Sequence, residues 1–187
     1  TAIDTTAKTV ALSTDETLHY DHLLISTGSR PRKLSIDGSD LPGIHYLRTM
    51  DDVDGLRDGM QADANLVIVG GGYIGLEVAA VGRELGLNVH VLEMEERILQ
   101  RVTTPEMSAY YHQLHEGRGV NIHTNTAVTG FAGDGKVQEV LCGDKRFPAD
   151  IVIVGIGIIP NTELAEAAGI VCNNGIVVDD QCCTSDP

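Results

Sequence analysis

The stretch LVIVGGGYIGLEVAA, residues 66–80, decides the fold class of this chain. Its first residues are apolar, as in a buried β-strand, and they lead directly into a glycine-rich turn. Apolar residues then recur at helical spacing as far as Leu85, and Gly86 is placed to end the helix. A second strand, NVHVLE at residues 88–93, follows. This order predicts a βαβ unit and therefore an α/β, Rossmann-like fold.

The glycines of the turn follow the pattern G-x-G-x-x-G, which is typical of dinucleotide binding. Gly70 permits a tight turn at the strand end, Gly72 lets backbone N–H groups approach a pyrophosphate, and Gly75 lets the helix pack closely on the strand. The N-terminus of the helix then faces the phosphates with its partial positive charge. We therefore expect these three glycines to bind a dinucleotide.

An acidic residue stands where this motif needs one to bind ribose. Glu93 ends the second strand, about 20 residues beyond the glycines. A carboxylate there accepts hydrogen bonds from the adenosine ribose hydroxyls and repels a 2′-phosphate, and Glu95 and Glu96 add to the negative field. These residues favour NADH over NADPH. FAD is the alternative ligand, because the same motif holds its adenosine half and the spacing does not separate the two.

Composition narrows the class of partner. The chain of 187 residues has a formal net charge of -14 at pH 7 and a pI of about 4.7, which argues against nucleic acid as a partner. The longest apolar run, residues 66–82, contains several glycines and Glu77, so it is a poor membrane span. We expect no membrane association and a cytoplasmic location.

Cysteine and histidine usage predicts no metal site. The four cysteines show no C-x-x-C spacing and are expected to be reduced; they are Cys142, Cys172, Cys182 and Cys183. His112 and His115 lie three residues apart on an expected helix, but no third ligand accompanies them.

Arg97 and Arg101 are candidates to flank the nucleotide, with ordinary surface positions as the alternative.

The remaining segments predict further elements of the same fold class. Residues 9–20 are typical of a hairpin and residues 22–26 of a buried strand. Thr49 and Thr104 are placed to cap helices, the second helix running over residues 104–117. We expect short strands within the segments 120–124, 127–133, 136–142 and 146–157, then a short helix capped by Asn161, and a last strand at 175–180.

Three segments together resemble one family. LLISTGSRPR (23–32), GGGYIGLEVAA (70–80) with VLE (91–93), and VGIGIIPNTELAEAAGI with the following NGIVVDDQCCTSDP (154–187) occur in the order typical of FAD-dependent pyridine nucleotide reductases. Within that family the chain is similar to the branch of putidaredoxin and ferredoxin reductases. The resemblance covers nearly the whole chain.

The resemblance implies a domain organisation. Members of the family insert an NADH domain into an FAD domain, which would explain why the glycine motif begins as late as residue 70. It implies a Rossmann-like three-layer (β-β-α) domain over residues 41–158. Residues 1–40 and 159–187 would be flanking segments of a split FAD-binding domain. The first glycine motif of such an FAD domain is missing from this chain, and so is the C-terminal domain of the family.

Site residues are also implied by the resemblance. For the nicotinamide side of NADH they are Tyr73, Ile74, Glu77, Gly155 and Gly157; for FAD they are Thr27, Gly28 and Arg32, which form an incomplete site. Alternatives stay open for several of them. Ile74 is equally suited to core packing, Glu77 to a solvated helix face, and the turn at Thr27 to an ordinary connection.

The activity implied by the resemblance is electron transfer. A hydride passes from NADH to FAD, and single electrons then pass to a two-iron, two-sulfur ferredoxin that serves an oxygenase. No general base or nucleophile is needed, because the protein mainly positions the two cofactors. The alternatives are another FAD and NADH oxidoreductase, such as a rubredoxin reductase, an NADH oxidase or a nitrite reductase component, and a dinucleotide-binding module without catalysis.

Overall fold

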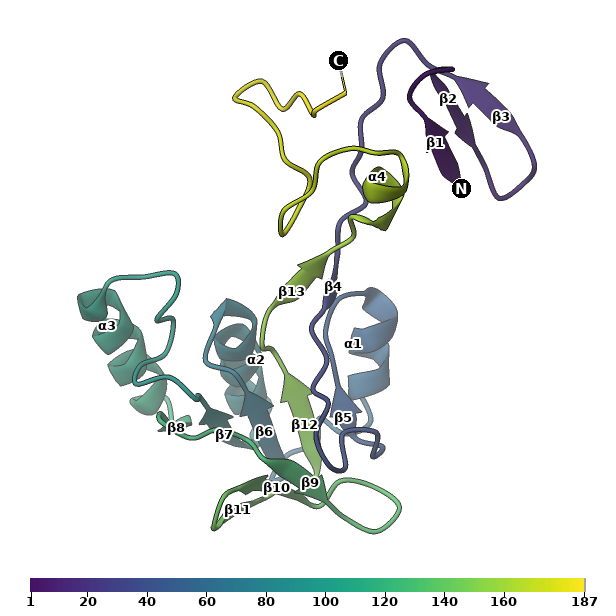
Figure 1. Ribbon diagram of the computed structural model, residues 1–187. Helices are drawn as coiled ribbons and strands as arrows, with labels where there is room; N and C mark the ends of the chain where they lie inside the picture. The colour runs from purple at the N-terminus through teal and green to yellow at the C-terminus, as the bar shows by residue number, and fades with distance from the viewer. Residues whose placement is uncertain (187) are drawn as a thin grey trace. The chain divides into compact units, whose positions relative to one another are not determined.

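A computed structural model describes residues 1–186 and divides the chain into two compact units (Figure 1). One unit comprises Thr1–Arg30 together with the chain from Ile158 onward, and the other is the continuous segment Pro31–Gly157. The predicted assignment of residues 1–40, 41–158 and 159–187 to FAD and NADH domains stays a prediction. No helix within residues 1–186 is both long enough and apolar enough to cross a membrane.

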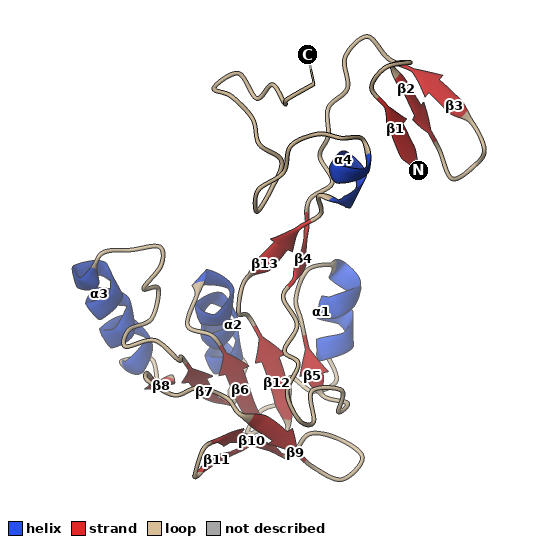
Figure 2. Cartoon of the chain, in the orientation of Figure 1, coloured by secondary structure: helices blue, strands red, loops and turns tan. Residues whose placement is uncertain are grey.

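The unit Pro31–Gly157 is built on a parallel sheet of five strands in the order β5-β12-β6-β7-β8. These strands are β5 (Ile44–His45), β6 (Asn65–Val69), β7 (Asn88–Leu92), β8 (Asn121–His123) and β12 (Ile151–Val154). Its helices are α1 (Met50–Leu56), α2 (Tyr73–Glu84) and α3 (Pro105–Glu116). A second, antiparallel sheet consists of β9 (Gly130–Ala132), β10 (Glu139–Cys142) and β11 (Lys145–Pro148). Figure 2 distinguishes the helices from the strands.

Alternate residues of the central strand β6 enter two different cores. Leu66 and Ile68 pack in a cluster that includes Leu56 of α1 and Ala79 of α2. Val67 and Val69 instead pack with residues of the antiparallel sheet, among them Phe131. Because side chains alternate across a strand, an apolar run of this kind covers both faces of the sheet. The parallel sheet therefore lies between helices and a second sheet, which confirms the predicted three-layer (β-β-α) fold.

Local signals set the helix ends of this unit. The Thr49 side chain accepts a hydrogen bond from the Asp52 N–H, and the Asp52 carboxylate accepts one from the Thr49 N–H, a capping box at α1. Thr104 caps α3, whose first residue is Pro105. Gly86 follows α2 with a φ of 84°. The structure confirms the predicted helix caps at Thr49 and Thr104 and the predicted helix end at Gly86.

The other unit contains a small antiparallel sheet and one short helix. Its elements are β1 (Ala2–Asp4), β2 (Thr9–Ala11), β3 (Thr17–His19), β4 (Ser29–Pro31, ending just past the unit boundary), β13 (Ile158–Pro160) and α4 (Glu163–Ala167). The order β1-β2-β3 includes the predicted hairpin, with Val10 opposite Leu18. Strands β4 and β13 form a two-stranded sheet.

Two predicted strands of this unit are wrong. Residues 22–26 form no strand, and Leu24 is 86% exposed. Residues 175–180 contribute only an isolated bridge between Ile176 and Cys172. An apolar run becomes a strand only when a neighbouring strand accepts its ladder hydrogen bonds, and within residues 1–186 neither segment has such a neighbour.

Candidate functional site

Three predicted site residues follow directly on three neighbouring strands. Val69 of β6 is paired with Val154 of β12 on one side and with Leu92 of β7 on the other. The next residues along these parallel strands are Gly70, Gly155 and Glu93. In an open parallel sheet, ligands bind beyond the carboxyl ends of the strands, so this row lies where a dinucleotide site is expected.

Gly70 and Gly75 meet the steric demands of the turn in different ways. Gly70 has a φ of 105°, a conformation that side chains disfavour, and a Cβ atom there would lie 2.5 Å from the carbonyl oxygen of Gly155. A Cβ atom on Gly75 would lie 2.2 Å from the carbonyl oxygen of Gly70. The chain therefore reverses tightly after β6, and α2 packs directly against the turn.

Gly72 differs from both because its surroundings are open. It is the N-cap of α2 with extended backbone, and a Cβ atom placed on it would meet nothing within 4 Å. Among the described residues no side chain caps this helix. A helix N-terminus without a side-chain cap leaves its first N–H groups available, which is the arrangement that binds a phosphate or pyrophosphate.

The residues that follow on α2 present apolar and acidic side chains to the outside. Tyr73 is 53% exposed and Ile74 is 44% exposed, and Glu77, one turn further along, is exposed. The alternative that Ile74 packs in the core is therefore wrong. Both side chains lie in the first turn of α2, next to the open space at Gly72.

Glu93 is half-buried and its carboxylate is tied to the glycine turn. Its Oε2 accepts a hydrogen bond of 2.7 Å from the N–H of Gly71, and its Oε1 accepts one of 2.8 Å from the N–H of Glu95. A carboxylate offers about four acceptor positions, so capacity remains for ribose hydroxyls. The contact with Gly71 was not predicted from the sequence, because no local pattern links residues 71 and 93.

Gly155, Gly157 and Arg32 lie in the same unit as the glycine turn. The N–H of Gly155 donates to the carbonyl of Val69 over 2.8 Å, which extends the sheet by one residue. Gly157 is exposed, and its carbonyl accepts a hydrogen bond of 2.9 Å from the N–H of Arg32. The Arg32 side chain is exposed. The roles of these three residues in binding stay predictions.

In the other unit, Asn161 holds the turn that contains Thr27 and Gly28. Its Nδ2 donates to the carbonyl of Thr27 over 2.9 Å, and its backbone N–H donates to the carbonyl of Gly28 over 3.0 Å. Its Oδ1 accepts a hydrogen bond of 2.7 Å from Arg30. The prediction that Asn161 caps α4 is wrong, because the N-cap is Thr162. The Asn161 side chain binds the turn instead.

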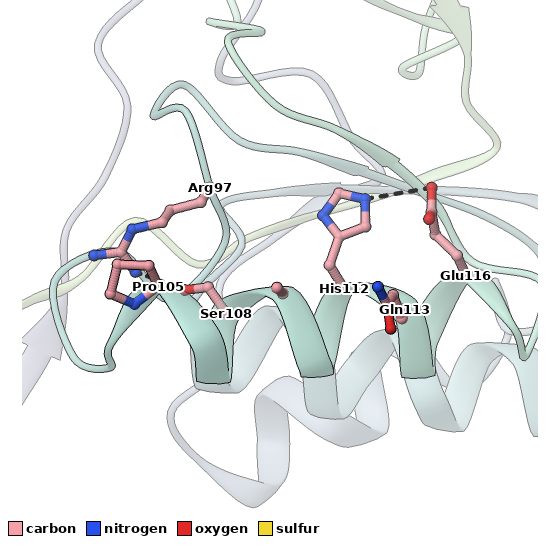
Figure 3. Close-up of a pocket in the computed structure, with 7 residues that line it drawn as sticks. Arg97, Pro105, Ser108, His112, Gln113 and Glu116 are labelled. Atoms are coloured by element: carbon pink, nitrogen blue, oxygen red, sulfur yellow. Dashed lines mark hydrogen bonds and ion pairs between the residues drawn. The ribbon is translucent and has the colours of Figure 1, made fainter.

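A shallow groove on α3 contains Arg97 (Figure 3). The guanidinium donates 2.6 Å to the hydroxyl of Ser108, which is 2% exposed, and also binds the carbonyls of Thr103 and Gln100. Through these hydrogen bonds Arg97 stabilises the loop before α3. The contacts therefore favour a structural role for Arg97 over a contact with the nucleotide. Arg101 forms an exposed ion pair with Glu95 at 3.3 Å.

The histidines of α3 do not gather a metal site in the described part of the chain. His112 contacts Glu116, one helical turn on, with an Nε2 to Oε1 distance of 3.3 Å (Figure 3). Within residues 1–186 no group of three potential ligands is present.

The four cysteines form no disulfide in the structure, and burial raises the pKa of the Cys142 thiol.

A pair of histidines that sequence reasoning missed joins strands β7 and β8. His90 Nδ1 and His123 Nε2 are 3.0 Å apart, and their rings stack with Phe147 against both. Burial lowers the pKa of both side chains, so both are held neutral near pH 7. Only the pairing of β7 with β8 brings residues 33 positions apart into contact.

Comparison with known proteins identifies the family. The family model described as pyridine nucleotide-disulphide oxidoreductase matches residues 1–187. This chain belongs to that family. Putidaredoxin reductase of Pseudomonas putida is 46% identical over 194 residues, covering 100% of this chain and 46% of the relative. The ferredoxin–NAD(+) reductase subunit of a benzene 1,2-dioxygenase system from the same species is 42% identical, covering 99% of this chain and 45% of the relative.

A solved structure agrees with these sequence relatives. A covalent complex of putidaredoxin reductase with putidaredoxin matches with a TM-score of 0.93 and 46% identity, covering 100% of this chain and 46% of the matched chain. The resemblance to the ferredoxin reductase branch is thereby confirmed. The chain spans about half the length of the curated relatives that it matches.

Proposed function

We propose that this chain is the NADH-binding portion of a flavoprotein reductase that passes electrons from NADH through FAD to a ferredoxin-type iron–sulfur protein. The single observation that carries the proposal is the placement of the Glu93 carboxylate beside the open, uncapped N-terminus of α2 at Gly72. An anion-binding helix end next to a carboxylate is the pairing that pyrophosphate and adenosine ribose require.

The glycine turn and the strand ends beside it would hold the two halves of a dinucleotide. The N–H groups at the start of α2 would hold the pyrophosphate, and Glu93 would bind the adenosine ribose. Tyr73, Ile74 and Glu77 from α2, with Gly155 and Gly157 after β12, would line the nicotinamide half. When bound, NADH supplies the hydride and FAD accepts it; the chain's own contribution is to orient the nicotinamide and to exclude water.

The proposed FAD contacts are Thr27, Gly28 and Arg32, and this part of the site is incomplete in the chain. The Thr27 hydroxyl already donates to the carbonyl of Asn161, and Gly28 has a φ of 68°. Because these three residues are only a part of the FAD site that the resemblance implies, we expect the chain to bind NADH and to retain little FAD.

Calorimetric titration with NADH, NADPH and FAD tests this proposal. We expect saturable binding of NADH, weaker binding of NADPH and little binding of FAD. Tight FAD binding would contradict the domain assignment, and absence of NADH binding would contradict the function. Gly72→Ala should weaken NADH binding about tenfold, whereas Gly55→Ala, at an open position on the surface of α1, should leave it unchanged.

The electron acceptor is proposed from the relatives, one of which is named as a putidaredoxin reductase and another as the ferredoxin–NAD(+) reductase subunit of a dioxygenase system. We propose a two-iron, two-sulfur ferredoxin as partner, an oxygenase as final acceptor and the cytoplasm as location. Reduction of such a ferredoxin by the full-length flavoprotein and NADH, followed at the ferredoxin's visible absorbance, tests the acceptor. Faster reduction of rubredoxin or of dioxygen would favour a rubredoxin reductase or an NADH oxidase instead.

A further inference from the structure

The peptide unit of Gly71 is held from both sides by one segment of the chain. Its N–H donates to Oε2 of Glu93 over 2.7 Å, and its carbonyl accepts a hydrogen bond of 2.9 Å from the N–H of Leu99. Gly71 is buried, and a Cβ atom there would lie 2.7 Å from Cγ2 of Ile98. Residues 93–99 therefore bind both the N–H and the carbonyl of Gly71 and fill the space beside its Cα atom.

Glu93 is itself fixed by its neighbours. Its N–H donates to the carbonyl of His123 over 2.8 Å, and its carbonyl accepts a hydrogen bond of 2.8 Å from the N–H of Thr126. The second carboxylate oxygen accepts from the N–H of Glu95. A side chain anchored in this way presents Oε2 to Gly71 from a rigid position, unlike a solvated glutamate at a strand end.

Leu99 carries a conformational cost that packing compensates. Its φ is 55°, which is unfavourable for leucine, and its side chain is 3% exposed in a cluster with Leu76 and Ile98. Leu76 belongs to the first half of α2. The cluster therefore joins the segment that holds Gly71 to the helix whose N-terminus faces the proposed pyrophosphate.

We propose that Glu93 is a positioning residue as well as a ribose ligand: its carboxylate, together with the Leu99 N–H, orients the Gly71 peptide and thereby aims the following N–H groups at the pyrophosphate. The inference rests on the proposed NADH site and adds a second route by which Glu93 acts. Adenosine ribose recognition and pyrophosphate binding are then coupled through one side chain.

An NADH analogue without the adenosine 2′- and 3′-hydroxyls separates the two routes, because it offers no ribose hydroxyl to Glu93. We expect Glu93→Met to weaken binding of this analogue about tenfold, the effect of losing one charge-assisted hydrogen bond at Gly71. Glu93→Gln, which keeps an acceptor oxygen, should stay within about threefold of the unmodified protein. Glu84→Met is the matched control at an exposed position and should have no effect.

Equal analogue affinity for the unmodified protein and Glu93→Met would overturn the inference and leave Glu93 as a ribose ligand only. Equal losses in Glu93→Met and Glu93→Gln would also overturn it, because the acceptor oxygen would then be irrelevant. Both outcomes leave the proposed NADH site intact, since they are read from the ratio between variants.

Amide hydrogen exchange of Gly71 in the nucleotide-free protein tests the same contact without any ligand. We expect this amide to be protected in the unmodified protein and to exchange at least about tenfold faster in Glu93→Met, while the Val67 and Val91 amides stay unchanged. An unprotected Gly71 amide in the unmodified protein overturns the inference even if Glu93→Met does not fold. If NADH fails to bind at all, the proposed function fails, but this measurement still decides the role of Glu93.

Discussion

The carbonyl oxygen of Gly70 lies 2.2 Å from the position that a Cβ atom on Gly75 would occupy. No real Cβ atom tolerates this distance from a backbone oxygen, so the packing of α2 on the end of β6 requires glycine at residue 75. At Gly72, three residues earlier, a Cβ atom would meet nothing. Two glycines of one motif thus have different roles. Gly75 is required by the fold, and Gly72 leaves space for the proposed ligand.

Alanine at each position should separate these roles. We expect Gly75→Ala to lower the free energy of unfolding by about 1–3 kcal/mol, because the helix must move away from the turn. Gly72→Ala should change it by less than about 0.5 kcal/mol and should weaken NADH binding about tenfold, since its methyl group would occupy the open space. Urea denaturation and calorimetry measure the two effects. Equal destabilisation by both substitutions would contradict the assignment.

The charge of Glu93 should decide between NADH and NADPH. Removing one unit of charge at about 5 Å from a 2′-phosphate, in an effective dielectric near 20, removes about 3 kcal/mol of repulsion. Glu93→Gln should therefore reduce the preference for NADH by on the order of a hundredfold in a competition titration. Glu96→Gln, which removes an exposed charge, should reduce it much less. An unchanged preference in Glu93→Gln would exclude this role.

The His90 and His123 pair should make stability depend on pH. Burial lowers the pKa of both side chains from 6.5 in the folded state, and for His123 the neighbouring His90 and Lys145 lower it further. The unfolded chain then binds more protons below about pH 6.5, so the free energy of unfolding should fall as the pH drops through and below that value. Phe147 is the other ring packed against the pair, and it carries no charge.

Urea denaturation at several pH values between 7.5 and 5 measures this dependence. His123→Gln should give a shallower decline than the unmodified protein, because one of the titrating groups is lost. His22→Gln removes an exposed histidine and should leave the slope unchanged. The same slope for both variants would show that the pair does not contribute, and it would direct the test to the half-buried His45 and His115, whose pKa values are also lowered by burial.

Asn161 should stabilise the turn at Thr27 through its side chain. Asn161→Ala removes the hydrogen bonds to the Thr27 carbonyl and to Arg30, and we expect a loss of about 1 kcal/mol in the free energy of unfolding. Asn173→Ala, at an exposed position, is the control. Stability of Asn161→Ala equal to that of the control would show that the Asn161 backbone, through its hydrogen bonds with the Gly28 carbonyl and the Thr27 hydroxyl, holds the turn without the side chain.

Features that depend only on residues close together in the sequence can be predicted from the sequence. The capping box at Thr49, the proline at the start of α3 and the glycine after α2 each act within about one helical turn, so the local pattern states them. Errors occurred where a distant partner decides. The apolar residues 22–26 are typical of a strand, yet no strand pairs with them among residues 1–186, and Leu24 remains exposed.

By itself, the sequence determined the βαβ unit, the three glycines of the turn and the acidic residue expected to bind ribose, because periodicity and spacing encode them directly. Tertiary structure decided what those residues contact. The register of β12, β6 and β7 brings Gly155, Gly70 and Glu93 to one edge, and the fold of residues 93–99 closes on the Gly71 peptide. The physical reason is that hydrogen bonds between distant backbone groups depend on strand order and packing, which local spacing does not specify.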